Sequence, residues 1–216
     1  MIRSMQDKIS TLVIVPGHAS FKDGVDISVI SDFDNDEHWA LQEFQKGEPY
    51  FYVEHIKRAI DLIDADSLLI FSGGRTRKES GRKWSEARTY NEIAKTLPGY
   101  PLGRVELEEY ARDSFQNLDF SIRKFKQIFG YEPSKIRVVG WNFKNKRFEF
   151  HAQTLKVPLS VFEYIGVNDP VDKDGALIGE HRALDAFSQN PFGDSGQLAQ
   201  KRMERDPWND GEPTDY

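Results

Sequence analysis

Cations and small polar residues gather at the ends of four apolar segments of this sequence. The first segment is followed by Pro16-Gly17-His18 and the second by Ser72 to Arg77. The later ones are followed by Tyr110 to Ser114 and by Trp141 to Arg147. Arg and Lys side chains form strong hydrogen bonds with phosphate and carboxylate groups. The recurrence of this pattern predicts a binding site for a small anionic molecule.

Glycines in the first two of these stretches favour the same interpretation. Gly17 follows the first segment, and Ser72-Gly73-Gly74 follows the second. Glycine permits positive φ and close approach, so backbone amides at these positions can surround an anion. An ordinary strand-to-loop turn is the alternative. The neighbouring Arg75 and Arg77 favour ligand binding by the second stretch.

The third stretch combines a helix cap with a set of hydrogen-bond donors. Asp113 or Ser114 is suited to cap the helix that follows, and Asn117 lies one turn further along. Capping accounts for one of these residues but not for Arg112 and Asn117 together. We therefore predict that Arg112, Ser114 and Asn117 contact the ligand.

In the fourth stretch, Asn142, Lys144 and Arg147 are ligand-binding candidates. Lys144 and Arg147 are three residues apart and so lie side by side on a helix. Cations at a helix start oppose the helix dipole unless a negative partner is present, which favours anion contact. A solvated basic face is the alternative.

Three residues are candidates for catalysis: His18, Glu86 and Asp113. His18 is the histidine that adjoins a predicted strand end, although a purely structural role is the alternative. Glu86 can orient a ligand hydroxyl or balance Arg75, or it can simply favour a helix start. We interpret His55 and His151 as packing or surface residues. His181 in the extension is a candidate to cap the pocket.

The elements that must position these side chains alternate along the chain. Apolar segments predict five strands, at Thr11 to Val15, Ser67 to Phe71, Val105 to Leu107, Ile136 to Gly140 and Leu159 to Tyr164. Four show little alternation, as strands buried on both faces do, whereas the third alternates and suits a sheet edge. Helical spacing predicts helices over Tyr52 to Ile63, Glu86 to Leu97, Ser114 to Phe129 and Phe143 to Leu155. The order predicts a doubly wound, mostly parallel, five-stranded α/β fold, Rossmann-like, with helices on both faces.

We divide the chain into an α/β domain, residues 1–165, and a C-terminal extension, residues 166–216. The extension is rich in Asp, Gly and Pro with two short helical patches. We expect it to pack on the same domain. Its last residues, Asp206 to Tyr216, are expected to be mobile.

Composition excludes several classes of function. A net charge of -6 over 216 residues argues against a nucleic-acid partner. The absence of cysteine excludes disulfides and thiolate chemistry.

The acidic loop Asp32 to His38 resembles part of an EF-hand but has Glu37 where glycine is required, so no metal site is expected. The apolar runs are far shorter than the about 20 residues that span a bilayer, and Met1 to Ser10 shows no signal-like segment, so we expect a cytoplasmic protein without a membrane partner.

Taken together, these motifs resemble those of the DUF218 family, which includes YdcF-like and SanA-like proteins. The resemblance covers Leu12 to Ile165 and rests on Gly17, Ser72-Gly73-Gly74, Ser85-Glu86-Ala87, Glu109, Arg112-Asp113-Ser114, Asn117, Lys144 and Arg147. The chain has Ser114 where the family usually has threonine, which keeps the hydroxyl. It has Lys144 where the family usually has histidine, which removes a group that titrates near neutral pH. Acid-base chemistry at Lys144 is therefore not expected.

The resemblance implies little about activity, although it suggests S-adenosylmethionine as one ligand; the cofactor is otherwise unknown. Our leading hypothesis is an enzyme, a hydrolase or transferase, acting on a phosphorylated, nucleotide-like or S-adenosylmethionine-like molecule. The first alternative is a metabolite-binding or regulatory module without catalysis. The second is a scaffold whose extension binds a partner.

Overall fold

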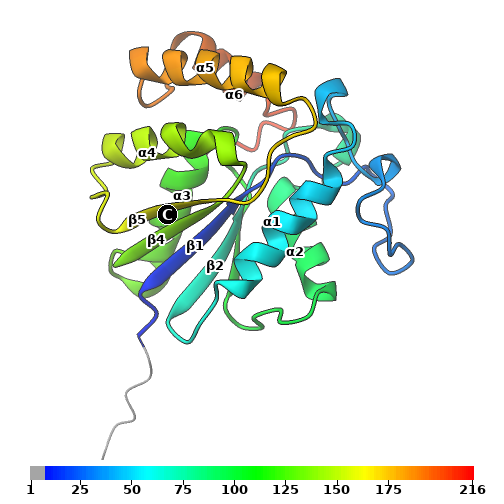
Figure 1. The fold of residues 1–216 in the computed structure, drawn as a ribbon, viewed down its shortest axis with the longest axis horizontal. Coiled ribbons are helices and arrows are strands. Elements are labelled where there is room, and N and C mark those ends of the chain that lie inside the picture. Colours follow the sequence, from blue (N-terminus) through cyan, green and yellow to red (C-terminus); the bar gives the residue numbers. More distant parts are fainter. Residues whose placement is uncertain (1–7) are drawn as a thin grey trace, which may run out of the picture.

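The computed structural model describes residues 8–216 and contains one parallel sheet (Figure 1). Its strands are β1 (Thr11–Pro16), β2 (Ser67–Ser72), β3 (Val105–Glu108), β4 (Lys135–Gly140) and β5 (Phe162–Gly166). Their order is β3-β2-β1-β4-β5, and every neighbouring pair is parallel. The predicted five-stranded α/β fold is confirmed, and β3 lies at an edge as expected.

Helices cover both faces of the sheet, as a doubly wound fold requires. The helices α1 (Pro49–Asp61) and α2 (Glu86–Thr96) pack on one face around Val13, Leu69 and Phe71. The helices α3 (Ser114–Phe129) and α4 (Asn145–Thr154) pack on the other around Ile14, Ile70 and Val138. Every position of β1 and β2 is buried. This two-sided burial is the reason these strands show no alternation in sequence.

Most elements differ from the prediction by one or two residues at an end, and two begin three residues away from their predicted starts. The fifth strand begins at Phe162 rather than Leu159, because the amide of Val161 donates to the carbonyl of Pro158 (3.0 Å) in a turn. It is also an edge strand with exposed positions, so the expectation of burial on both faces was wrong for it. Helix α1 begins at Pro49 rather than Tyr52, since proline is tolerated in the first helical turn.

Four single turns of 3-10 helix complete the α/β part of the chain. They are η1 (Asp36–His38), η2 (Glu43–Gln45), η3 (Lys78–Ser80) and η4 (Asn142–Lys144). The turn η4 leads directly into α4 after β4 ends. It therefore places Lys144 immediately beyond the carboxyl end of β4.

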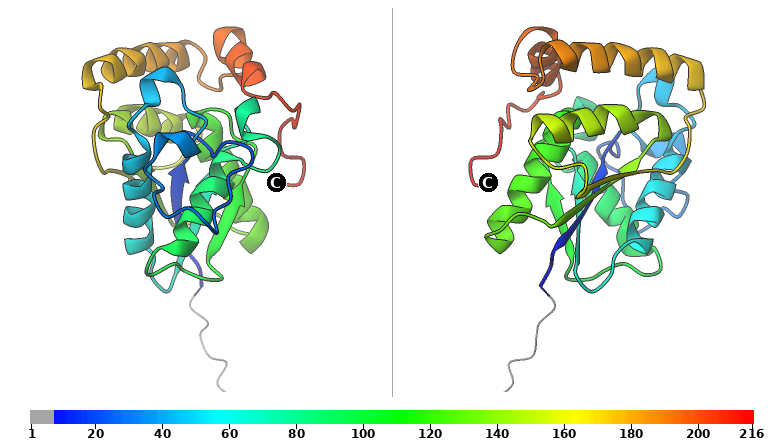
Figure 2. Two further views of the ribbon diagram at one scale, coloured as in Figure 1. Left: turned by 90° about the vertical axis from the view of Figure 1, so that its right-hand side faces the viewer. Right: turned by 60° about the vertical axis from the view of Figure 1, so that its left-hand side comes forward.

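The extension lies across the carboxyl ends of the strands (Figures 1 and 2). It forms α5 (Lys173–Gln189) and α6 (Gly196–Glu204), and α5 is longer than the short patch expected. After α6 the chain runs back along the domain, where Asp206 and Asp210 lie 2.9 and 3.3 Å from Arg112 and Arg75. The predicted mobility of this tail stays a prediction. Among the described residues, no helix is both long and apolar enough to cross a membrane. Residues 1–7, for which no signal segment is predicted, lie outside the described part.

The strand order creates a topological switch beside β1. From β1 the chain proceeds outward to β2 and β3, and it then returns to β4 on the other side of β1. In open parallel sheets, ligands bind beyond the carboxyl ends of the strands at such a point. The residues that follow β1 and β4 are therefore the first place to look for a site.

Candidate functional site

A cavity of about 780 Å³ lies where the fold predicts it, between the carboxyl ends of the strands and the helices of the extension. Eight of its lining residues are Lys or Arg: Arg77, Arg112, Lys144, Arg147, Arg182, Lys201, Arg202 and Arg205. Five are acidic: Glu48, Glu86, Asp113, Asp172 and Glu180. The cavity therefore carries an excess of positive residues, although the whole chain carries a formal charge of -6.

Most of the candidates predicted from sequence meet in this cavity. The ones that line it are Gly17, His18, Arg77, Glu86, Arg112, Asp113, Ser114, Asn117, Lys144 and Arg147. They come from the loops after β1, β2 and β3, from the turn η4, and from the first turns of α2, α3 and α4. Five candidates do not line it: Ser72, Gly73, Gly74, Arg75 and Asn142.

The amides of Gly73 and Gly74 are not available to an anion, contrary to the sequence hypothesis. The Gly73 amide donates to the carbonyl of Glu108 (2.9 Å), and the Gly74 amide donates to the carbonyl of Ala111 (2.7 Å). These bonds continue the pairing of β2 with β3 beyond the strand ends. The hydroxyl of Ser72 is also occupied, since it donates to the buried carboxyl of Glu108 (2.5 Å). The hydrogen bonds of Ser72, Gly73 and Gly74 therefore connect β2 to β3 and the loop after it, and these groups do not bind a ligand.

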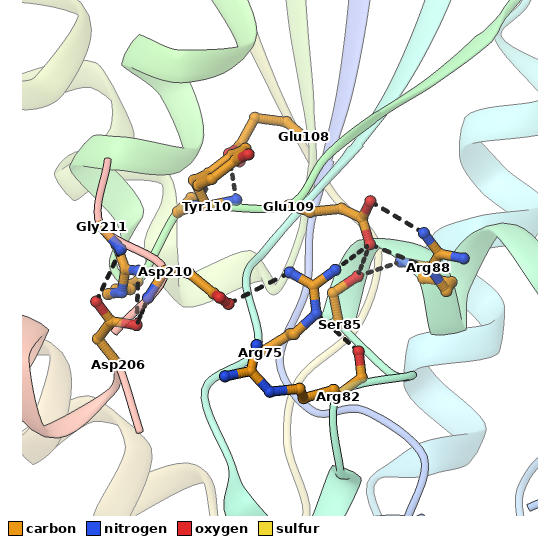
Figure 3. Close-up of polar contacts among 12 residues, drawn as sticks. Arg75, Arg82, Ser85, Arg88, Glu108, Glu109, Tyr110, Asp206, Asp210 and Gly211 are labelled. Atoms are coloured by element: carbon orange, nitrogen blue, oxygen red, sulfur yellow. Dashed lines mark hydrogen bonds and ion pairs between the residues drawn. The ribbon is translucent and has the colours of Figure 1, made fainter. Parts of the chain in front are cut away.

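Arg75 does not line the cavity and joins three segments of the chain instead (Figure 3). Its guanidinium lies 3.6 Å from Glu109 and 3.3 Å from Asp210, and its Nε donates to the carbonyl of Arg82 (2.9 Å). Asn142 does not line the cavity either, and its backbone amide donates to the carbonyl of Asn168 (2.9 Å). The positions of Arg75 and Asn142 near strand ends in the sequence did not reveal that they lie outside the cavity.

Glycine at positions 17 and 73 makes room for Glu86. A β-carbon at Gly17 would lie 2.4 Å from the β-carbon of Glu86, and one at Gly73 would lie 2.6 Å from its Oε2. The Glu86 carboxyl accepts a hydrogen bond from Thr76 (2.6 Å), and burial raises its pKa above the ordinary value. The glycines thus allow a carboxyl group to sit between two strand ends.

We expect the substitution Gly17→Ala to destabilise the protein by about 1–3 kcal/mol, because the new methyl group overlaps a β-carbon that the α2 backbone holds in place. Chemical denaturation would measure this loss. The matched control is Gly179→Ala on α5, where an added β-carbon has no neighbour within 4 Å. We expect that change to stabilise by roughly 0.5–1 kcal/mol, because alanine is the better helix former. A neutral Gly17→Ala variant would contradict the assigned role.

His18 and Lys144 meet at the topological switch. His18 follows β1 and Lys144 ends η4 after β4, and the Lys144 Nζ lies 3.4 Å from the His18 Nδ1. Burial, followed by the charge of Lys144, lowers the pKa of His18 well below its ordinary value. Burial and the nearby Arg147 lower the pKa of Lys144 to about 7. Acid-base chemistry at Lys144 was not expected from the residue type, which does not reveal desolvation, and that expectation stays a prediction.

Several of the charged residues are already paired. The Arg112 guanidinium lies 2.9 Å from Asp206, and that of Arg147 lies 2.9 Å from Glu180. Both oxygens of Asp113 are engaged, since one accepts from the Gln116 amide (2.9 Å) and the other from Arg202 (2.6 Å). This engagement gives Asp113 a capping and pairing role instead of the predicted catalytic one.

Five of the eight cations of the cavity have no such partner. Within residues 8–216, no carboxylate lies at ion-pair distance from Arg77, Lys144, Arg182, Lys201 or Arg205, whereas Arg112, Arg147 and Arg202 are paired. Burial is the main cause that lowers the pKa of Arg205, whose guanidinium donates to the carbonyl of Arg112 (2.8 Å). Lys144 and Arg205 are desolvated, whereas Lys201 is exposed at the rim. Cations that are desolvated and unpaired are costly unless an anion joins them.

The sequence analysis did not predict the cavity residues that come from the extension and from the loop between β1 and α1. Lys201, Arg202 and Arg205 come from the end of α6, and Glu180 comes from α5. The four-residue spacing of Lys201 and Arg205, which places them on one helix face, was the available signal. Glu48 precedes α1 and accepts a hydrogen bond from Tyr52 (2.7 Å), and nothing in its local sequence marks it.

Two histidines assigned to packing lie close to the site. His55 on α1 is buried, and its ring centroid is 5.5 Å from that of His18. His151 on α4 is also buried, and its Nε2 is 2.9 Å from the Ser114 hydroxyl. His151 lies behind Ser114 against Phe187, so it links α3 to α4 and does not line the cavity.

This chain is similar to a yeast protein. The relative is an uncharacterised protein of Saccharomyces cerevisiae, YOR238W, which is 26% identical; the alignment covers 95% of this chain and 86% of the yeast protein. The similarity thus includes most of the extension that roofs the cavity. No family model matches the chain, and no solved structure matches it.

Proposed function

We propose that this protein binds a small anionic molecule in the cavity beneath α5 and α6. The observation that carries the proposal is a group of five lining cations without a carboxylate partner in the described chain: Arg77, Lys144, Arg182, Lys201 and Arg205. A phosphorylated or nucleotide-like molecule supplies the missing negative charge. Guanidinium and ammonium groups bind phosphate oxygens by charge-assisted hydrogen bonds.

The buried carboxyl groups of the cavity support the proposal. Burial raises the pKa of Glu48, Glu86 and Glu180, which favours their neutral forms. Glu180 is already paired with Arg147 (2.9 Å), and Glu48 and Glu86 accept hydrogen bonds from Tyr52 (2.7 Å) and Thr76 (2.6 Å). None of the three lies at ion-pair distance from the unpaired cations, which leaves these cations available to an anionic ligand.

Binding is tested by thermal shift with inorganic phosphate, pyrophosphate, nucleotides, sugar phosphates and S-adenosylmethionine. A ligand at 100 times its dissociation constant stabilises the folded state by about 2.7 kcal/mol. We expect at least one phosphorylated compound to raise the melting temperature. A screen in which none of these compounds shifts it, at any concentration up to several millimolar, would refute the proposal.

The double substitution Lys201→Gln and Arg205→Gln is expected to weaken binding of the best phosphorylated compound by about a hundredfold or more, because each of the two lost charged hydrogen bonds contributes about 1.5–3 kcal/mol. Isothermal calorimetry would measure the change. The matched control is Lys126→Gln on α3, whose exposed ammonium pairs with Glu132 (2.7 Å) away from the cavity. Equal affinities for the double variant and the control would count against the site.

We propose an enzyme rather than a passive binding module, because His18 and Lys144 form a close pair of titratable groups inside the cavity. The engagement of both Asp113 oxygens is the observation that favours the alternative, a metabolite-binding or regulatory module. Turnover assays with phosphoesters and nucleotides distinguish the two. Membership of the DUF218 family and a cytoplasmic location stay proposals that rest on the sequence.

A further inference from the structure

The amine of Lys144 is unusual among the cations of the cavity. Its Nζ lies 3.4 Å from the His18 Nδ1, and no carboxylate of the described chain lies at ion-pair distance from it. Four charged groups affect the pKa of its amine: Arg147 at the start of α4, Arg205 of the extension, and the acids Glu48 and Glu180. Lys144 thus sits between positive neighbours, at the wall of a space that admits a ligand.

This arrangement suits a nucleophilic amine better than a permanent cation. A lysine that is desolvated and placed beside other cations loses its proton readily and is then able to attack a carbonyl carbon. The pKa of Lys144, lowered to about 7 by burial and Arg147, agrees with this chemistry. Arginine residues at 147 and 205 supply fixed positive charge for another part of the same ligand.

We propose that Lys144 forms a Schiff base with a small aldehyde or ketone that carries a phosphate group. The proposal rests on the proposed function, since it names the class of anionic molecule that the cavity takes. The phosphate contacts the unpaired guanidinium of Arg205 and the ammonium of Lys201, and the carbonyl carbon faces Lys144. The cavity volume of about 780 Å³ leaves ample room for such a molecule.

The reaction balances without an oxidant or a reductant. The unprotonated Lys144 amine attacks the carbonyl carbon, a C–N bond forms, and a proton passes from nitrogen to the former carbonyl oxygen to give a carbinolamine. A nearby acid then donates a proton to that hydroxyl, which leaves as water while the nitrogen returns a proton to the acid. Glu48 suits this role, because burial raises the pKa of its carboxyl and it lines the same cavity.

Borohydride trapping tests the proposal directly. The protein is incubated at pH 7 with glycolaldehyde phosphate or with glycolaldehyde, which differ only in the phosphate, and sodium cyanoborohydride then reduces any imine to a stable secondary amine. Peptide mapping by mass spectrometry locates the adduct. We expect modification of Lys144 to exceed that of Lys146 by about tenfold or more with the phosphorylated aldehyde, because the cations of the cavity hold its phosphate beside the desolvated Lys144 amine, whereas Lys146 is exposed to solvent.

Lys146 is the matched control, since it is an exposed lysine two residues further along, at the start of α4. The variant Lys146→Arg should leave trapping at Lys144 unchanged, whereas Lys144→Arg should abolish the preferred adduct while circular dichroism verifies its fold. We also expect inorganic phosphate to compete with the phosphorylated aldehyde. We expect the unphosphorylated aldehyde to show a clearly smaller preference for Lys144, because the desolvated amine still reacts with it but no phosphate contact holds it beside that amine.

The outcomes separate this inference from the proposed function. If phosphate raises the melting temperature but Lys144 is modified no faster than Lys146, the Schiff base is refuted and anion binding stands. If phosphate and phosphorylated compounds have no effect and the phosphorylated aldehyde shows no preference for Lys144, both proposals fail. Preferred, phosphate-dependent trapping at Lys144 supports both.

Discussion

Replacing Glu108 by alanine is expected to lower the free energy of unfolding by about 3 kcal/mol, because it leaves buried donors without an acceptor. The Glu108 carboxyl accepts from the amides of Tyr110 (2.7 Å) and Ala111 (3.0 Å) and from the Ser72 hydroxyl (2.5 Å). These bonds fix the turn that leads from β3 into the cavity wall. Chemical denaturation at pH 7 would measure the loss.

Two control variants sharpen this test. Glu106→Ala removes a largely solvated carboxyl from the same strand, and we expect a change within about 0.5 kcal/mol. Glu108→Gln keeps one acceptor oxygen, so its loss should be much smaller than that of alanine. A Glu108→Ala protein as stable as Glu106→Ala would contradict the role assigned to these hydrogen bonds.

Glu108 also affects the pH dependence of stability, because burial raises its pKa to about 7. An acid whose pKa is higher in the folded state binds more protons there, so its contribution to stability decreases as pH rises from about 4.3, its unfolded value, to about 7. Glu108→Gln cannot titrate and should flatten this part of the profile.

The second large effect is expected on acidification, and it arises from His55. Burial lowers the pKa of His55 to about 3, and its Nε2 is 2.8 Å from the Asn168 Oδ1. Below about pH 6.5, His55 takes up a proton in the unfolded chain but not in the folded protein. The free energy of unfolding therefore decreases by about 1.4 kcal/mol for each pH unit, down to about pH 3. Burial acts in the same direction on His18 and His151.

The test compares stability profiles between pH 7 and 4. Because the raised carboxyl pKa values act in the opposite direction, the informative quantity is the difference between variant and wild type. We expect His55→Gln to remove about 1.4 kcal/mol per pH unit from the acid-side slope. The control is His181→Gln on α5, where the side chain is exposed. Identical slopes for His55→Gln and wild type would show that His55 is accessible to protons in the folded protein.

The fold could be predicted from the sequence because its signals are local. Unbroken apolar runs at β1 and β2 reflect burial on both faces, and the spacing of Phe115, Leu118 and Phe125 reflects one buried side of α3. Asp113 and Gly130 mark the ends of that helix, and the structure places its cap residues there. The strand ends then follow from the parallel topology, which explains why His18 and Lys144 were found in advance as candidates near one another.

The sequence by itself determined the class of fold, the edge at which a site forms, and most of the polar residues gathered there. Only the tertiary structure decided which of them face the cavity, since Arg75 turns to Asp210 and the amides of Gly73 and Gly74 complete strand pairing. It also brought in Lys201 and Arg205 from the extension and lowered the pKa of Lys144. The physical reason is that hydrogen-bond partners, desolvation and charge pairing depend on residues far apart in the chain, whereas periodicity and capping depend on near neighbours.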